Sequence, residues 1–170
     1  MLSSPDHVKA WSSAPKGTSA LHFDTGMNRL GLKVELLGTS LAGLQKLQPV
    51  LVMSHLACAD ETGHRMNAAQ RSTFDDIAAA FPDTPASLAN SAGCYLGKAF
   101  GYDLTRPGLA LYGGSRPPKG LRINPGLTLD ATILSVFDGN LGDTVGYGAT
   151  RTLEQDTQLA TVGIGYADGL

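Results

Sequence analysis

The alternation of apolar and polar positions predicts short strands and amphipathic helices that follow one another along the chain. In the segment 67–81 apolar residues recur every three to four positions and a proline follows, which predicts a helix that ends there. The segment 36–47 has the same spacing. Helices are thus predicted over 5–14, 36–47 and 67–81, a turn over 14–19, and strands over 21–23, 50–54 and 86–89, with 109–112 following after a short loop.

The alternation of strand, loop and helix continues through about residue 113 and indicates parallel βα units. The predicted fold class is therefore α/β, with a first domain over 1–113. In such folds the chemistry lies at the carboxyl ends of the strands, and the polar motifs of this sequence fall there.

The composition changes at the end of this domain. The segment 114–126 is rich in Gly, Pro and Arg and is expected to be a linker. Residues 127–170 are β-rich, with strands predicted over 127–136, 144–152 and 158–164. Because about three strands make a poor independent core, we expect the chain to be an internal piece of a longer protein.

The bulk composition excludes several classes of function. Hydrophobic residues make up 42% and charged residues 16% of the chain, which is typical of a globular protein. The net charge is −2 and no Lys or Arg cluster occurs, so neither nucleic acid nor an anionic membrane is an expected partner. No apolar run is long enough to span a bilayer, and no secretory signal is visible. Cys58 and Cys94 are expected to be buried free thiols in a reducing cytoplasm.

Five polar clusters stand at predicted strand ends or between strands, at 24–31, 54–60, 89–93, 105–113 and 145–150. The first combines an acid, a hydroxyl, two glycines and an arginine, which suits a small anionic ligand. Taken singly, each cluster also has an ordinary structural explanation, such as a glycine-rich turn, a core histidine, a helix N-cap or a half-buried tyrosine. No P-loop, HExxH, GxSxG or zinc-ligand spacing occurs, and no metal site is predicted.

In their order along the chain the clusters resemble the motifs of the alanine racemases. The similarity extends over 20–170 and lies in 23–31, 54–57, 89–92, 106–113, 145–150 and 164–169. It implies a partial TIM-type (β/α) barrel that binds pyridoxal 5′-phosphate, followed by the start of a β-rich C-terminal domain. It also implies the interconversion of L-alanine and D-alanine, which supplies D-alanine for peptidoglycan, by a cytoplasmic homodimer.

The resemblance assigns most of the cofactor contacts to the first domain. It implies that Arg106 donates a hydrogen bond to the pyridine nitrogen and that His55 hydrogen-bonds to Arg106 and helps to fix it. A guanidinium does not readily give up a proton, so the ring nitrogen would stay unprotonated. The residues that the resemblance places around the phosphate are Ser91, Asn90 and the backbone of Gly108 and Leu109.

Three further residues match positions near the substrate. The resemblance places Arg29 near the substrate carboxylate and the phenolic oxygen of the cofactor. Tyr147 matches the catalytic tyrosine that reaches the active site of the partner subunit and handles the proton on the L face. Tyr166 matches a tyrosine that lines the substrate entrance.

The sequence also departs from the family pattern. The motif of the Schiff-base lysine does not occur, and Lys9, Lys16, Lys33, Lys46, Lys98 and Lys119 all lack its context. His22 stands where some members carry a carbamylated lysine that orients Arg29. We therefore expect this chain alone not to racemise alanine. The alternatives are a non-catalytic pyridoxal-phosphate-binding protein on the same barrel, a racemase for another amino acid, and a decayed or incomplete gene product.

Overall fold

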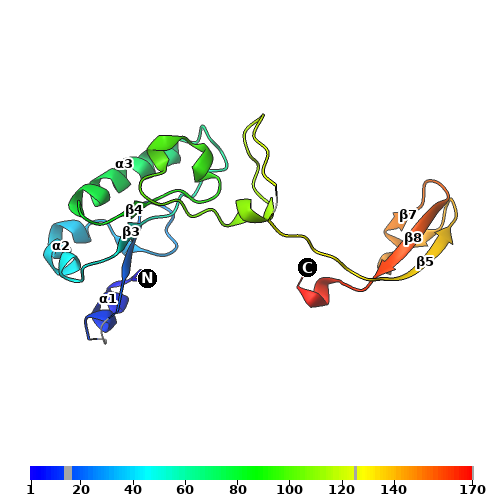
Figure 1. Ribbon diagram of the computed structural model, residues 1–170, viewed down its shortest axis with the longest axis horizontal. Helices are drawn as coiled ribbons and strands as arrows, with labels where there is room; N and C mark the ends of the chain where they lie inside the picture. The colour runs from blue at the N-terminus through cyan, green and yellow to red at the C-terminus, as the bar shows by residue number, and fades with distance from the viewer. Residues whose placement is uncertain (14–16, 125, 170) are drawn as a thin grey trace. The chain divides into compact units, whose positions relative to one another are not determined.

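The computed structural model describes residues 1–13, 17–124 and 126–169, so the turn predicted over 14–19 lies partly outside the described residues. The chain falls into two compact units, Met1–Leu127 and Thr128–Leu170 (Figure 1). Each unit is described by itself.

The first unit is built on a four-stranded parallel sheet with the strand order β2-β1-β3-β4. Its strands are β1 (Ala20–Asp24), β2 (Leu32–Lys33), β3 (Leu51–Met53) and β4 (Ala86–Ser87). The predicted strands correspond to β1, β3 and β4, whereas the two-residue strand β2 was not expected. Parallel neighbours need a crossover between them. Helices lie in the connections from β1 to β3 and from β3 to β4, whereas a loop joins β1 to β2. The predicted α/β class with parallel βα units is confirmed.

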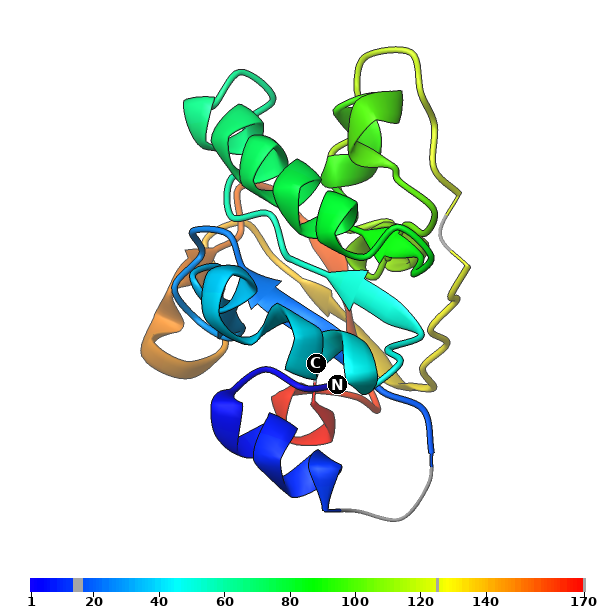
Figure 2. The ribbon, with the colours of Figure 1, turned by 90° about the vertical axis from the view of Figure 1, so that its left-hand side faces the viewer.

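Three α-helices accompany the sheet: α1 (Pro5–Ser12), α2 (Leu36–Lys46) and α3 (Arg65–Ala80). The helix α1 begins where the Ser4 side chain accepts a hydrogen bond from the amide of His7, with Pro5 in the first turn. Figures 1 and 2 show α2 and α3 on the same face of the sheet. All three helices were predicted from the sequence, with ends that differ by a few residues.

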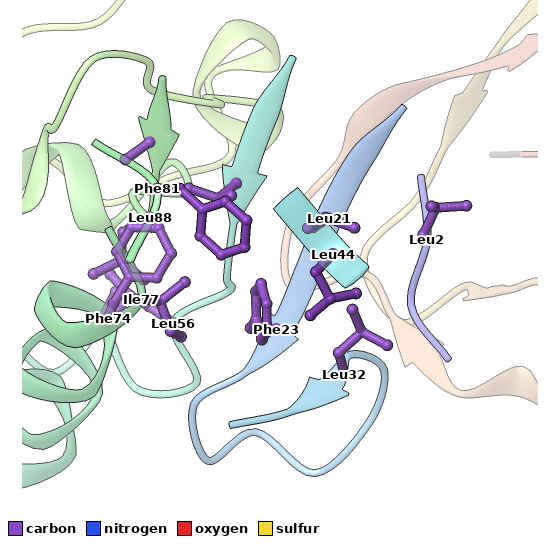
Figure 3. Close-up of a cluster of buried hydrophobic side chains, with 13 residues drawn as sticks. Leu2, Leu21, Phe23, Leu32, Leu44, Leu56, Phe74, Ile77, Phe81 and Leu88 are labelled. Carbon is purple, nitrogen blue, oxygen red and sulfur yellow. The ribbon is translucent and has the colours of Figure 1, made fainter. Parts of the chain in front are cut away.

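The hydrophobic core lies between these two helices and the sheet (Figure 3). Leu21 and Phe23 of β1 face Leu44 of α2, while Phe74 and Ile77 of α3 complete the cluster, and all five are buried. Burying a side chain of this size contributes about 1.5–3 kcal/mol. Packing in the core therefore holds the strands, and hence their ends, in fixed positions.

Beyond β4 the chain forms short 3₁₀ helices rather than further strands of the sheet. They span Gly93–Tyr95, Lys98–Phe100 and Leu109–Tyr112 in the first unit, and Tyr147–Ala149 and Tyr166–Asp168 in the second. Residues 109–112 thus add no strand to the βα series.

The second unit is β-rich, as predicted, with two small antiparallel sheets. The strand β5 (Ile133–Gly139) pairs with β8 (Thr157–Val162), and β6 (Thr144–Val145) pairs with β7 (Arg151–Thr152). The strand predicted over 127–136 begins only at Ile133. The segment 144–152 is a hairpin rather than one strand, because the backbone turns at Gly148, where φ is 72°.

Candidate functional site

The register of the sheet brings three strand ends to one edge. His22 of β1 lies opposite Met53 of β3, and Met53 lies opposite Ser87 of β4. Because the strands are parallel, the segments that follow them leave the sheet from the same side. The polar clusters at 24–31, 54–60 and 89–93 therefore meet at the carboxyl edge.

A cavity of about 790 Å³ lies beside this edge within the first unit. Its lining includes all six residues that the sequence predicted as cofactor contacts, namely His55, Asn90, Ser91, Arg106, Gly108 and Leu109. The other three predicted site residues, Arg29, Tyr147 and Tyr166, are not among the lining residues. No lysine occurs among the described residues that line it.

The guanidinium of Arg106 is held by acceptors from two strand ends. Its Nη2 donates to the carbonyl oxygen of Ser54 at 2.5 Å, and its Nη1 donates to the Oγ of Ser87. The hydroxyl of Ser87 donates a hydrogen bond to the carbonyl of Leu104 at 2.6 Å, so the Oγ of Ser87 can accept the hydrogen bond from Arg106. The backbone amide of Arg106 donates to Ala89 at 2.9 Å. Burial lowers the pKa of Arg106, but a guanidinium keeps its proton near neutral pH.

Ser91 organises the loop that follows Arg106. Its Oγ accepts hydrogen bonds from the amides of Gly108 and Ala110, both at 3.0 Å. The Gly108 amide is therefore engaged within the protein, while the hydroxyl proton of Ser91 remains available to a ligand. Leu109 begins a 3₁₀ helix between those two amides.

Asn90 closes the adjoining turn. Its Nδ2 donates to the carbonyl of Leu56 at 3.2 Å, and its Oδ1 accepts from the amide of Gly93 at 2.9 Å. The side chain thus links the segment after β4 to the segment after β3.

Two histidines lie near Arg106. Desolvation lowers the pKa of His55, and the positive charges of Arg106 and Arg29 lower it further. Desolvation is also the largest cause that lowers the pKa of His22, and the electrostatic effects of Arg106 and His55 lower it further. Both rings are therefore neutral at pH 7. Among the described residues no hydrogen bond joins the His55 ring to Arg106, and the buried Nδ1 of His22 has no partner.

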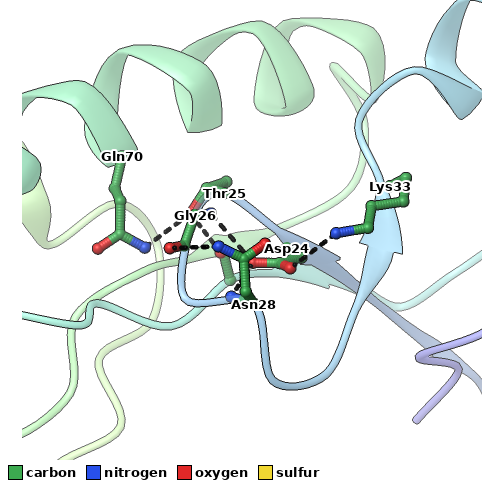
Figure 4. A network of polar contacts seen from close by, with 7 residues as sticks. Asp24, Thr25, Gly26, Asn28, Lys33 and Gln70 are labelled. Atoms are coloured by element: carbon green, nitrogen blue, oxygen red, sulfur yellow. Dashed lines mark hydrogen bonds and ion pairs between the residues drawn. The ribbon is translucent and has the colours of Figure 1, made fainter.

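The loop after β1 is organised by its own acid rather than by its arginine (Figure 4). The Oδ1 of Asp24 accepts from the amides of Gly26 and Asn28, both at 3.0 Å, and Oδ2 pairs with the ammonium of Lys33 at 3.3 Å. Arg29 follows on the same loop and is exposed. Its charge nevertheless contributes to lowering the pKa of His55 and of His22.

Tyr147 and Tyr166 belong to the second unit. Each lies in a 3₁₀ helix, and their side chains are 102% and 92% exposed. Their phenols are therefore available for contacts outside the second unit.

Sequence reasoning missed the residues that support this site. Ser87 and the carbonyl of Ser54 hold Arg106, and Gln70 of α3 bonds to the segment that carries His55. One signal was present for Gln70, because it is a polar residue on the apolar face of the predicted helix 67–81. No comparable signal marks Ser87, a small residue inside a predicted strand.

A parallel βα sheet with a donor-rich cavity at the carboxyl ends of its strands defines an α/β protein whose site lies where (β/α) barrels carry theirs. The chain belongs to the alanine racemase family. Residues 1–116 match the family model "Alanine racemase, N-terminal domain", and residues 126–170 match "Alanine racemase, C-terminal domain".

Individual relatives agree with this assignment. The chain is 47% identical to an alanine racemase of Rhodospirillum rubrum, in a match that covers 99% of this chain and 48% of the relative. It is 49% identical to an alanine racemase of Rhizobium meliloti, in a match that covers 88% of this chain and 40% of the relative. It is similar to the crystal structure of alanine racemase from Bartonella henselae with covalently bound pyridoxal phosphate, with a TM-score of 0.72 and 32% identity over 99% of this chain and 49% of that one.

The chain therefore spans about half the length of the curated relatives that it matches. Among the residues that the structure describes, no helix is both long and apolar enough to cross a membrane.

Proposed function

We propose that this chain holds pyridoxal 5′-phosphate in its cavity, as part of a protein that interconverts L-alanine and D-alanine. The observation that carries the proposal is the convergence of all six predicted cofactor residues on one cavity, from segments that lie far apart in the sequence. Membership of the alanine racemase family and the similarity to a structure with covalently bound pyridoxal phosphate support the choice of cofactor.

The chemistry of the cavity wall fits this cofactor. Pyridoxal phosphate combines an anionic phosphate ester with an aromatic ring whose nitrogen accepts a hydrogen bond. The cavity offers the hydroxyl of Ser91, the backbone around Leu109 and the charged guanidinium of Arg106, which suit an anion and a ring acceptor. A neutral His55 adds no further positive charge beside Arg106.

Each residue would have a distinct role in holding the cofactor. Ser91 and the backbone of Leu109 would face the phosphate on a loop shaped by Asn90, and Gly108 would line it without donating, because its amide is bonded to Ser91. Arg106 would donate to the ring nitrogen, and because it keeps its proton that nitrogen would stay unprotonated. When bound, pyridoxal phosphate withdraws electron density from the substrate and weakens its Cα–H bond.

The substrate side of the site is proposed on the same grounds. Racemisation requires that a proton leave one face of Cα and return on the other. Tyr147 would handle the proton on the L face of a partner subunit in a homodimer, and its full exposure leaves the phenol free to do so. Arg29 would contact the substrate carboxylate, and Tyr166 would line the substrate entrance. Cys58 and Cys94 are free thiols, which suits a cytoplasmic location, but the expectation that both are buried is wrong, because Cys58 is half-buried and Cys94 is exposed.

A second candidate function is cofactor binding without catalysis. The observation that favours it is the lack of a lysine among the described residues that line the cavity. The resemblance implies that the Schiff-base lysine is both the covalent anchor of the cofactor and the base on the D face, and the described lining of the cavity supplies neither.

Titration of the chain with pyridoxal 5′-phosphate, followed by absorbance and by quenching of protein fluorescence, tests the proposal. We expect saturable binding that Arg106→Lys weakens about tenfold, because the ammonium cannot reproduce the forked bonds to Ser54 and Ser87. Arg116→Lys is the matched control, since Arg116 lines the same cavity but is exposed. Equal affinities for both variants would contradict the assignment of Arg106.

A further inference from the structure

Gln70 is a polar side chain on the apolar face of α3, and the structure buries it completely. On that face it accompanies Phe74 and Ile77, which belong to the hydrophobic core. A buried amide is destabilising unless its donors and acceptor are paired. The partners of Gln70 therefore indicate why an amide stands at this position.

The amide of Gln70 joins three backbone and side-chain groups from two loops. Its Nε2 donates to the Oγ1 of Thr25 at 3.1 Å (Figure 4) and to the carbonyl of His55 at 2.9 Å. Its Oε1 accepts from the amide of Ala57 at 2.9 Å. Both N–H groups and the oxygen are thus used, and α3 is tied to the loops that follow β1 and β3.

Two routes connect this amide to the cavity. The first runs through Thr25, whose Oγ1 lies 2.7 Å from the Oγ of Ser54, while the carbonyl of Ser54 accepts from Arg106. The second is direct, because His55 and Ala57 both line the cavity and both are bonded to Gln70 through their backbones. A displacement of Gln70 would therefore move both Arg106 and His55.

We propose that Gln70 is a positioning residue for the cofactor cavity, because it holds the segment 54–57 in the conformation that places His55 and orients Arg106. The identity of the ligand rests on the proposed function, whereas the positioning is a property of the chain itself. A glutamate of the same size does not replace Gln70, because a carboxylate has no proton to donate to the His55 carbonyl.

Amide hydrogen exchange in the 170-residue chain tests the positioning without any ligand. Gln70→Met keeps the size of the side chain and removes its hydrogen bonds, while Phe74→Leu disturbs the core on the same helix. The exchange rate of Ala57 is compared with that of Val52, whose amide donates to Pro85 in the sheet. We expect the Ala57-to-Val52 ratio to rise about tenfold in Gln70→Met and to stay unchanged in Phe74→Leu. An unchanged ratio in Gln70→Met, or an equal rise in both variants, would overturn the proposal.

Titration with pyridoxal 5′-phosphate measures the consequence for the cavity. We expect Gln70→Met to weaken binding of pyridoxal 5′-phosphate about tenfold, because a displaced Arg106 or His55 loses a contact with the cofactor that is equivalent to one or two hydrogen bonds. We expect Phe74→Leu to leave the affinity unchanged. An affinity of Gln70→Met equal to that of the unsubstituted chain would overturn the link to the cavity. If the unsubstituted chain binds no pyridoxal phosphate, the proposed function fails, while the exchange measurement still decides the role of Gln70.

Thr25→Val provides a second variant if Gln70→Met does not fold. It retains the shape of the side chain and removes only the hydroxyl between Gln70 and Ser54. We expect weaker binding of pyridoxal 5′-phosphate with no change in Ala57 exchange, because the direct bonds of Gln70 to His55 and Ala57 remain. An unchanged affinity would overturn the route to Arg106, and faster Ala57 exchange would overturn the separation of the two routes.

Discussion

At Asp24, burial and hydrogen bonding act on one carboxyl group in opposite directions. Desolvation raises its pKa, but the hydrogen bonds from the amides of Gly26 and Asn28 and the ion pair with Lys33 outweigh it, so that the pKa is lowered. The fold therefore stabilises the carboxylate form. Its side chain is 5% exposed, so the hydrogen bonds from the two amides are little screened by solvent.

Asp24→Asn should reduce stability in a way that depends on pH. A folded-state pKa below the unfolded value of about 3.9 stabilises the fold above that pH, and this contribution is lost as the pH falls through the folded-state pKa. We expect the variant to lose about 1–2 kcal/mol of unfolding free energy at pH 7, and the difference from the unsubstituted chain to shrink below pH 4. Urea unfolding at several pH values measures it.

Lys33→Met is the matched comparison for that experiment. The Lys33 side chain is 65% exposed, so its ion pair is expected to contribute less than about 1 kcal/mol. The two backbone amides remain bonded to Asp24 in this variant. A difference between Asp24→Asn and the unsubstituted chain that is the same at pH 3 and pH 7 would show that the charge of Asp24 is not its source.

Single residues also show which parts of the candidate site could be predicted from the sequence. The cavity contains His55, Asn90, Ser91 and Arg106, which the resemblance to the alanine racemases assigned to the cofactor, whereas the residues alone indicated only polar clusters near strand ends. Ser87 was missed, because its role depends on pairing across strands that only the folded register defines.

Among the structural elements, the connection from β1 to β2 depends on one glycine. Gly31 has a φ of +135°, and a Cβ there would lie 2.4 Å from the backbone nitrogen of Asp24. A residue with a side chain would be strained at this dihedral angle and would clash with the backbone of Asp24. Gly38 in α2 is the opposite case, since a Cβ there meets nothing within 4 Å.

Gly31→Ala and Gly38→Ala should therefore change stability in opposite directions. We expect Gly31→Ala to lower the unfolding free energy by about 2–3 kcal/mol, through strain and overpacking. Gly38→Ala should raise it by about 0.5–1 kcal/mol, because alanine loses less entropy in a helix. Chemical denaturation of both variants under one set of conditions is the measurement. Destabilisation of similar size at both positions would contradict the geometry given for Gly31.

The elements predicted correctly are those whose pattern is long enough to be periodic. Three helices were recognised, and α3 most clearly, because its apolar face repeats over several turns. The two-residue strand β2 offers no period, and its pairing with β1 is set by the loop that Asp24 and Gly31 shape. The segment 109–112 is apolar, yet it forms a 3₁₀ helix whose preceding amide is bonded to Ser91. The hydrogen bonds of the folded site, rather than the local pattern, decide its structure.

At the scale of the whole molecule, the two units differ in how much of their apolar surface they bury. The first unit has a continuous core, whereas most of β5 in the second is exposed, including Ile133, Val136 and Phe137. The site residues are divided in the same way, since the cavity lies in the first unit and Tyr147 and Tyr166 lie in the second. The full set of proposed catalytic groups therefore requires contacts beyond the first unit.

The 170-residue chain should bind pyridoxal 5′-phosphate without racemising alanine. Racemisation needs one group that removes the proton from one face of Cα and another that returns a proton on the opposite face, and the described cavity residues include no lysine for the D face. We expect chiral chromatography to show no conversion of L-alanine beyond that of free pyridoxal phosphate at the same concentration. Conversion above this background that disappears in Arg106→Ala would show that the chain carries a complete site, and that a group other than lysine serves the D face.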